Sequence, residues 1–169
     1  MLYIYLRDRG ANVSYYIPQR DSEGYGMNRT AVELLAREGV DLIITVDNGV
    51  SAIDEIAYAK TLGMDVVVTD HHQPHENLPQ ACAIVDAHQA ADKSPFKKFS
   101  GAGVVLKLLI ALEGGAQELI LEEFADLAAV GTVGDSVPLL GENRTIVRRG
   151  LQLMERRDRP GLDALLDLG

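Results

Sequence analysis

Aspartate and histidine are concentrated in one stretch of this 169-residue chain. Residues 41–92 contain nine acidic residues, a single lysine and all four histidines, so this segment carries a net charge of −8, against −9 for the whole chain. Carboxylate oxygens and imidazole nitrogens together form a ligand set that suits divalent transition metals. The alternative is a solvated acidic face with loop histidines, and the predicted positions of these residues decide between the two.

Three motifs in this segment place an acidic residue directly after an apolar run. The runs cover residues 41–46, 65–69 and 82–85, and the motifs that follow them are Asp47-Asn48-Gly49, Asp70-His71-His72 and Asp86-Ala87-His88. Continuous apolar runs of this length are typical of strands buried on both faces of a parallel sheet. Such sheets bind ligands at the carboxyl ends of their strands, so the three motifs are expected to meet at one edge. This convergence favours a metal site over simple turn formation.

The Asp70-His71-His72 motif is the most specific signal of a metal site among the three. Adjacent histidines point in different directions, so one ring can bind a metal ion while the other faces a substrate. His75 and His88 are predicted to be surface loop residues, and Asn48-Gly49 by itself is also a common turn pair.

The elements that must position these motifs alternate between strands and helices. A further strand is predicted at residues 12–17, and helices are predicted at 2–9, 29–38 and 51–62, with Asn28 and Ser51 as N-caps. Alternation of this kind indicates an α/β fold with a parallel sheet and flanking helices. Beyond the sheet the pattern turns helical, at 102–112, 116–130, 145–157 and 162–168. We therefore predict an α/β part over 1–92 and a mostly helical part over 93–169, with a linker at 155–161.

Several candidate residues lie outside the acidic segment. Asp135 is flanked by glycine in a predicted tight loop, where it could form a turn or contribute to the metal edge. Gly101 and Gly103 open a predicted helix, and backbone N–H groups at a helix N-terminus bind anions. Close helix packing is the equally supported alternative for these glycines, although Lys97 and Lys98 favour phosphate slightly. Arg20 follows the first predicted strand and is a further candidate for a phosphate contact.

The composition excludes several classes of protein. One cysteine excludes an internal disulfide framework and a four-cysteine zinc site, and fits a reducing, cytoplasmic compartment. No apolar run reaches the 18 to 20 residues that a membrane span needs, and the charges of the N-terminus follow its apolar stretch, the reverse of a secretory signal. The acidic balance argues against a generic basic nucleic-acid binder.

Taken in order, these motifs resemble the DHH phosphoesterase family and, within it, the RecJ-like single-strand-specific exonucleases. The resemblance covers nearly the whole chain: residues 16–20 and 23–28, Thr45 to Gly49, the Asp70-His71-His72 motif, residues 95–97 with 101–104, and residues 130–139. It implies a Rossmann-like DHH domain that holds two divalent ions, usually Mn²⁺ or otherwise Mg²⁺. It further implies 5′-to-3′ degradation of single-stranded DNA in repair and recombination.

The resemblance also implies roles for individual residues. Asp47 would bridge the two ions, His71 and Asp135 would be further ligands, and Asp70 would be a ligand or would orient the histidines. His72 would contact the scissile phosphate. Two metal ions lower the pKa of a bridging water and clamp the phosphate oxygens.

One departure from the family pattern changes the expectation for this chain. The family's first motif is an Asp-x-Asp, and none occurs upstream of Asp47. We therefore expect a fragment that lacks about two metal ligands and the C-terminal substrate-binding modules, binds Mn²⁺ weakly or not at all, and has little nuclease activity. An exposed sheet edge would invite self-association. The alternatives are a phosphoesterase for short oligonucleotides, cyclic dinucleotides or pyrophosphate, and a non-catalytic DHH-fold scaffold.

Overall fold

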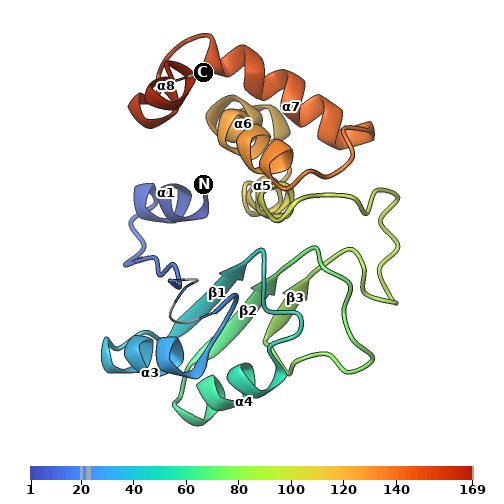
Figure 1. Ribbon diagram of the computed structural model, residues 1–169. Helices are drawn as coiled ribbons and strands as arrows, with labels where there is room; N and C mark the ends of the chain where they lie inside the picture. The colour runs from blue at the N-terminus through green and yellow to red at the C-terminus, as the bar shows by residue number, and fades with distance from the viewer. Residues whose placement is uncertain (20, 22–23, 169) are drawn as a thin grey trace. The chain divides into compact units, whose positions relative to one another are not determined.

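The computed structural model describes residues 1–19, 21 and 24–168 (Figure 1). Two compact units form: one runs from Leu6 to Lys97, and the other combines Met1–Tyr5 with the chain from Lys98 onward. The boundary predicted between residues 92 and 93 stays a prediction. No helix in the described part of the chain is long and apolar enough to cross a membrane.

The first unit contains a parallel sheet of three strands, as predicted. The strands are β1 (Leu42–Val46), β2 (Asp65–Thr69) and β3 (Ala83–Val85), in the order β1-β2-β3. Val46 pairs with Thr69, and Thr69 pairs with Val85, so the three strands end level with one another. β1 and β2 are joined by helix α4 (Ile53–Thr61), whereas residues 70–82 join β2 to β3 without a helix.

Helices α3 (Arg29–Arg37) and α4 pack against the same face of the sheet (Figure 1). The buried cluster beneath them is entirely apolar and consists of Val32, Val50, Ile56, Ala59, Met64, Val66 and Val68. The predicted N-cap of α3 is confirmed, since the Asn28 side chain accepts a hydrogen bond from the Ala31 N–H at 2.8 Å. This core fixes the sheet, and with it the positions at which the strands end.

Three local predictions for this unit are wrong. Residues 12–17 form no strand, and Tyr15 and Ile17 are exposed, because a polar–apolar alternation makes a strand only where a neighbouring strand pairs with it. β1 is not buried on both faces: Leu42 and Val46 are exposed, since β1 is an edge strand of the sheet that the described residues form. Helix α4 begins after Ala52 without a side-chain cap, so Ser51 does not cap it.

The second unit consists of packed helices, as predicted for the later part of the chain. They are α5 (Gly101–Leu112), α6 (Gln117–Gly134), α7 (Gly141–Met154) and α8 (Pro160–Leu166), and α1 (Leu2–Asp8) begins in this unit. α6 ends four residues later than predicted and takes in Gly131 and Gly134. The predicted linker at 155–161 is shorter in the structure, because α8 already starts at Pro160.

Glycine allows the closest contact between helices in this unit. A Cβ atom on Gly150 of α7 would overlap the carbonyl oxygen of Ala125 and the methyl group of Ala129, both on α6. The Gly150 backbone therefore lies directly against α6, and a larger residue at this position would prevent the contact.

Candidate metal centre

The three strands deliver three aspartates to one edge of the sheet. Asp47, Asp70 and Asp86 each follow the last residue of β1, β2 and β3. The backbone ladder continues to this edge, since Asp47 donates its N–H to Thr69 and Asp70 donates its N–H to Val85. The predicted convergence of the motifs at the carboxyl ends of the strands is therefore what the structure shows.

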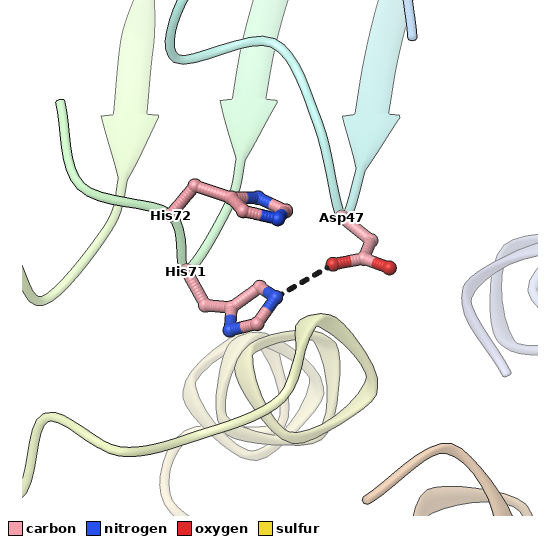
Figure 2. Close-up of side chains that lie close together, drawn as sticks. All are labelled: Asp47, His71 and His72. Atoms are coloured by element: carbon pink, nitrogen blue, oxygen red, sulfur yellow. Dashed lines mark ion pairs between the residues drawn. The ribbon is translucent and has the colours of Figure 1, made fainter. Parts of the chain in front are cut away.

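Asp47, His71 and His72 form a cluster at this edge (Figure 2). Each offers a potential ligand atom, and these atoms all lie within 4.8 Å of one another. His71 Nε2 faces Asp47 Oδ1 at 2.9 Å, and the two imidazole ring centres are 4.4 Å apart. This is the spacing at which one cation can reach all three side chains.

The turn that presents Asp47 is held by its neighbours. Asp47 adopts a left-handed backbone conformation (φ 64°), which is uncommon outside glycine. The Asn48 side chain donates to the Val46 carbonyl at 2.9 Å, and the Thr45 hydroxyl donates to the Asn48 carbonyl at 2.7 Å. Gly49 has φ 109° and lies so close to Thr45 that a Cβ there would collide with it. The sequence Asp47-Asn48-Gly49 thus serves as a turn that aims the Asp47 carboxylate.

Asp70 is buried and holds the two histidines in place. Its Oδ1 accepts hydrogen bonds from the N–H groups of His71 (2.8 Å) and His72 (3.2 Å), and lies 2.7 Å from His72 Nδ1. Its Oδ2 accepts from the Val50 N–H at 3.0 Å. Burial by itself would raise the pKa of Asp70, but these hydrogen bonds outweigh it and lower the pKa below its ordinary value. Asp70 is therefore a carboxylate that orients the histidines, whereas its direct ligation of metal stays a prediction.

The state of the His72 ring follows from this contact. A carboxylate only accepts hydrogen bonds, so the proton of the neutral His72 ring belongs on Nδ1. That assignment leaves Nε2 with its lone pair on the opposite edge of the ring. The His72 side chain is about half exposed, so this edge is accessible to a metal ion or, when protonated, to a phosphate oxygen.

The residues of the cluster fit a divalent metal ion. Asp47 Oδ1 is buried and lies 2.9 Å from His71 Nε2, but it accepts no well-aligned hydrogen bond within the part of the chain that the structure describes. A buried carboxylate oxygen of this kind costs free energy unless it gains a partner, and a cation supplies one. A mixed set of imidazole and carboxylate ligands favours Mn²⁺, whereas Mg²⁺ prefers a set made only of oxygen ligands.

The end of β3 carries a buried pair that the sequence did not predict. Asp86 is buried and accepts a hydrogen bond from the His88 N–H at 2.8 Å, and His88 Nδ1 lies 3.4 Å from the same carboxylate oxygen. Burial raises the pKa of Asp86, and the charge of Asp70 acts in the same direction, against the hydrogen bonds from His88. The His88 side chain is only 21% exposed, so His88 is not the surface loop residue that was predicted, whereas His75 is exposed as predicted.

Tyr25 is a member of this site that sequence reasoning about metal ligands missed. Its hydroxyl donates to the Asp47 carbonyl at 2.8 Å, and its ring lies edge-on to His72 at 6.4 Å between centres. The ring remains largely exposed. Its signals in the sequence were its place in the glycine-flanked segment 24–26 and in residues 23–28, which the family resemblance covers.

Three of the other predicted site residues belong to the helical unit. Asp135 is the C-cap residue of α6, and Gly101 and Gly103 open α5, all in the helical unit. The Gly103 N–H is already bonded to the Ser100 hydroxyl at 3.0 Å, an N-cap contact. Arg20 lies outside the described residues. The roles predicted for these four residues stay predictions.

Comparison with known proteins gives the family. Residues 1–132 match the model of the DHH family, N-terminal domain. The chain belongs to the DHH family. The family is named after the motif Asp-His-His, which is Asp70-His71-His72 in this chain. The motif lies at the edge of the sheet where Asp47, His71 and His72 could hold a metal ion.

Named relatives of this DHH chain are RecJ proteins. It is 45% identical over 163 residues to the single-stranded-DNA-specific exonuclease RecJ of Bacillus subtilis, covering 96% of this chain and 20% of that protein. It is 40% identical over 169 residues to RecJ of Salmonella typhimurium, covering 93% and 29%. The chain thus spans about a fifth to a third of the length of these curated relatives.

Solved structures agree with these relatives. A crystal structure of exonuclease RecJ bound to manganese matches with a TM-score of 0.78 and 39% identity, over 89% of this chain and 38% of that one. RecJ from Thermus thermophilus in complex with Mn²⁺ matches with a TM-score of 0.69 and 35% identity, over 89% and 21%.

Proposed function

We propose that this chain supplies the DHH part of a two-metal-dependent phosphodiesterase, a RecJ-like 5′-to-3′ exonuclease on single-stranded DNA. The observation that carries the proposal is the Asp47–His71–His72 cluster at the ends of β1 and β2. Similarity to RecJ proteins, two of them in manganese-bound structures, supports both the reaction and the metal.

The proposed division of labour begins with the metal ligands. Asp47 and His71 would hold Mn²⁺, or Mg²⁺ in its place, and Asp135 would be a further ligand. When bound, two such ions supply a hydroxide nucleophile at neutral pH and neutralise charge on the phosphate. The left-handed turn at Asp47 and the hydrogen bonds that Asp70 accepts keep the carboxylate and the imidazoles in fixed positions, so little reorganisation accompanies metal binding.

The remaining residues would act on the substrate. His72, fixed through Nδ1 by Asp70, would contact the scissile phosphate, and Arg20, Gly101 and Gly103 would contact phosphate oxygens. The exposed Tyr25 ring beside His72 offers a face on which a base can stack. An aromatic platform of this kind favours a nucleic-acid substrate over pyrophosphate, which has no base to stack.

A chimaeric protein tests the proposal independently of where this chain begins and ends. The matching segment of the Bacillus subtilis relative is replaced by this chain, and nucleotide release is followed with Mn²⁺ on single- and double-stranded DNA labelled at either end. We expect release from the 5′ end of single strands. His71→Gln should reduce the rate about 100-fold through loss of metal, while His75→Gln should not change it.

Two outcomes would contradict this proposal. An inactive chimaera beside an active parent would show that this segment cannot supply the metal site. A chimaera that prefers cyclic dinucleotides or dinucleotides to long single strands would support the short-substrate alternative.

A further inference from the structure

The Asp-x-His turn of the DHH motif occurs a second time on the neighbouring strand. After β2, Asp70 accepts the N–H of His72 and faces its Nδ1 at 2.7 Å. After β3, Asp86 accepts the N–H of His88 and faces its Nδ1 at 3.4 Å. The two aspartates start from paired positions, because Thr69 and Val85 are partners in the ladder. The same Asp-x-His turn is therefore present on adjacent strands of one sheet, with a short ring contact at His72 and a longer one at His88.

The burial of the second pair indicates that it is built for a ligand rather than for solvent. The Asp86 side chain is fully buried, and its Oδ2 has no hydrogen-bond partner among the described residues. His88 Nδ1 is buried as well, so the exposed 21% belongs to the rest of the side chain. A buried carboxylate behind a partly open imidazole compensates the charge of an imidazolium, whose outer N–H can then bind an anion.

We propose that His88, oriented by Asp86, binds the phosphate next to the scissile one on a single-stranded DNA substrate. This inference rests on the proposed function, in which His72 contacts the scissile phosphate. Neighbouring strands are about 4.8 Å apart, so the two Asp-x-His turns are offset by one strand along the edge. A row of two imidazoles, each beside a buried aspartate, can thus follow two successive phosphates of one backbone. His88 would be a binding residue that favours chains of at least two phosphodiester linkages.

The test uses the 169-residue chain with Mg²⁺ and two probes, the thymidine dinucleotide with one linkage and the trinucleotide with two. Ring nitrogen resonances of the histidines are followed by NMR during titration. We expect both probes to shift His72, and only the trinucleotide to shift His88. His88→Gln should weaken trinucleotide binding about tenfold, the scale of one charge-assisted hydrogen bond, and leave dinucleotide binding unchanged. His75→Gln, at an exposed histidine of the same segment, should change neither.

A second variant separates positioning from general loss of structure. In the wild-type chain bound to the trinucleotide, the His88 ring should carry a proton on both nitrogens and donate its Nε2–H to the phosphate. Asp86→Asn should reduce this doubly protonated form and lose the preference for the trinucleotide, although His88 is still present.

The failures of the two proposals are distinguishable. A His88 ring that stays silent while His72 responds, or a His88→Gln variant that weakens both probes equally, would overturn this inference alone. A His72 ring that responds to neither probe would overturn the proposed function, and the role of His88 with it.

Discussion

At the scale of single residues, the account depends on Asp70 more than on any other side chain. It accepts four hydrogen bonds, three of them from the two histidines that it precedes. Both the direction of the His72 ring and its tautomer follow from this one buried carboxylate. A residue that positions metal ligands in this way typically contributes 10- to 100-fold to metal affinity.

We therefore expect Asp70→Asn to weaken Mn²⁺ binding by roughly 10- to 100-fold, because an amide accepts fewer of these hydrogen bonds and places an N–H group against them. Electron paramagnetic resonance of free Mn²⁺ at high protein concentration measures this. Asp54→Asn, which removes an exposed acid of the same segment, is the matched control. Equal affinities for the two variants would show that Asp70 is dispensable.

The residue types of the site were predictable, and their surroundings were not. Asp47, His71 and His72 follow from two apolar runs and the rule for parallel sheets. The burial of His88 was not predictable, because nothing in Asp86-Ala87-His88 says that the ring folds back onto the carboxylate. Tyr25 was missed because its contact with Asp47 joins positions 22 residues apart through an irregular loop.

At the scale of elements, the strands and helices follow from the periodicity of the sequence. The wrong predictions occur where contact with a neighbouring element determines the local structure. The strands β1, β2 and β3 and most helices lie within a few residues of the predicted ranges. Residues 12–17 carry a strand-like pattern but pair with no strand among the described residues. α6 continues through Gly131 and Gly134, which the sequence predicts to lie in a loop. Gly131 lies against Ala102, so packing stabilises a helical end that propensity disfavours.

The crossing of α6 and α7 provides a prediction at this scale. Gly150→Ala should destabilise the protein by about 1 to 3 kcal/mol, because the new methyl group would overlap the Ala125 carbonyl. This loss exceeds the gain in helix propensity, which is under about 1 kcal/mol. Denaturant unfolding measures the difference. Gly134→Ala, at a helical glycine with open space around it, should be neutral or slightly stabilising; similar values for the two would refute tight packing at residue 150.

The edge of the sheet provides another prediction at the scale of elements. We propose that β1, which has no strand on its outer side among the described residues, allows self-association through strand pairing. Leu42 on this strand is exposed, so Leu42→Lys should reduce the apparent mass in light scattering at high concentration. Leu112→Lys, at an exposed leucine at the end of α5, is the control. A strictly monomeric wild-type chain would contradict the proposal.

At the scale of the whole molecule, the charge of −9 has a local origin. The segment 41–92 carries −8, and the cluster of Asp47, His71 and His72 lies within it. Two divalent ions would bring this segment to −4, so the acidity is compatible with a phosphate substrate once metal is bound. We still expect these 169 residues to bind metal weakly, because the sequence contains no Asp-x-Asp to complete the ligand set.

Paramagnetic broadening by trace Mn²⁺ tests the central claim most directly, because it detects weak binding. Backbone NMR spectra are recorded for the wild-type chain and for the His71→Gln and His75→Gln variants. We predict selective broadening of residues 47–49 and 70–72 in the wild type and in His75→Gln, and its loss in His71→Gln. Broadening centred elsewhere, such as on the acids Asp54 and Glu55 of α4, or unchanged by His71→Gln, would contradict a metal site at Asp47, His71 and His72.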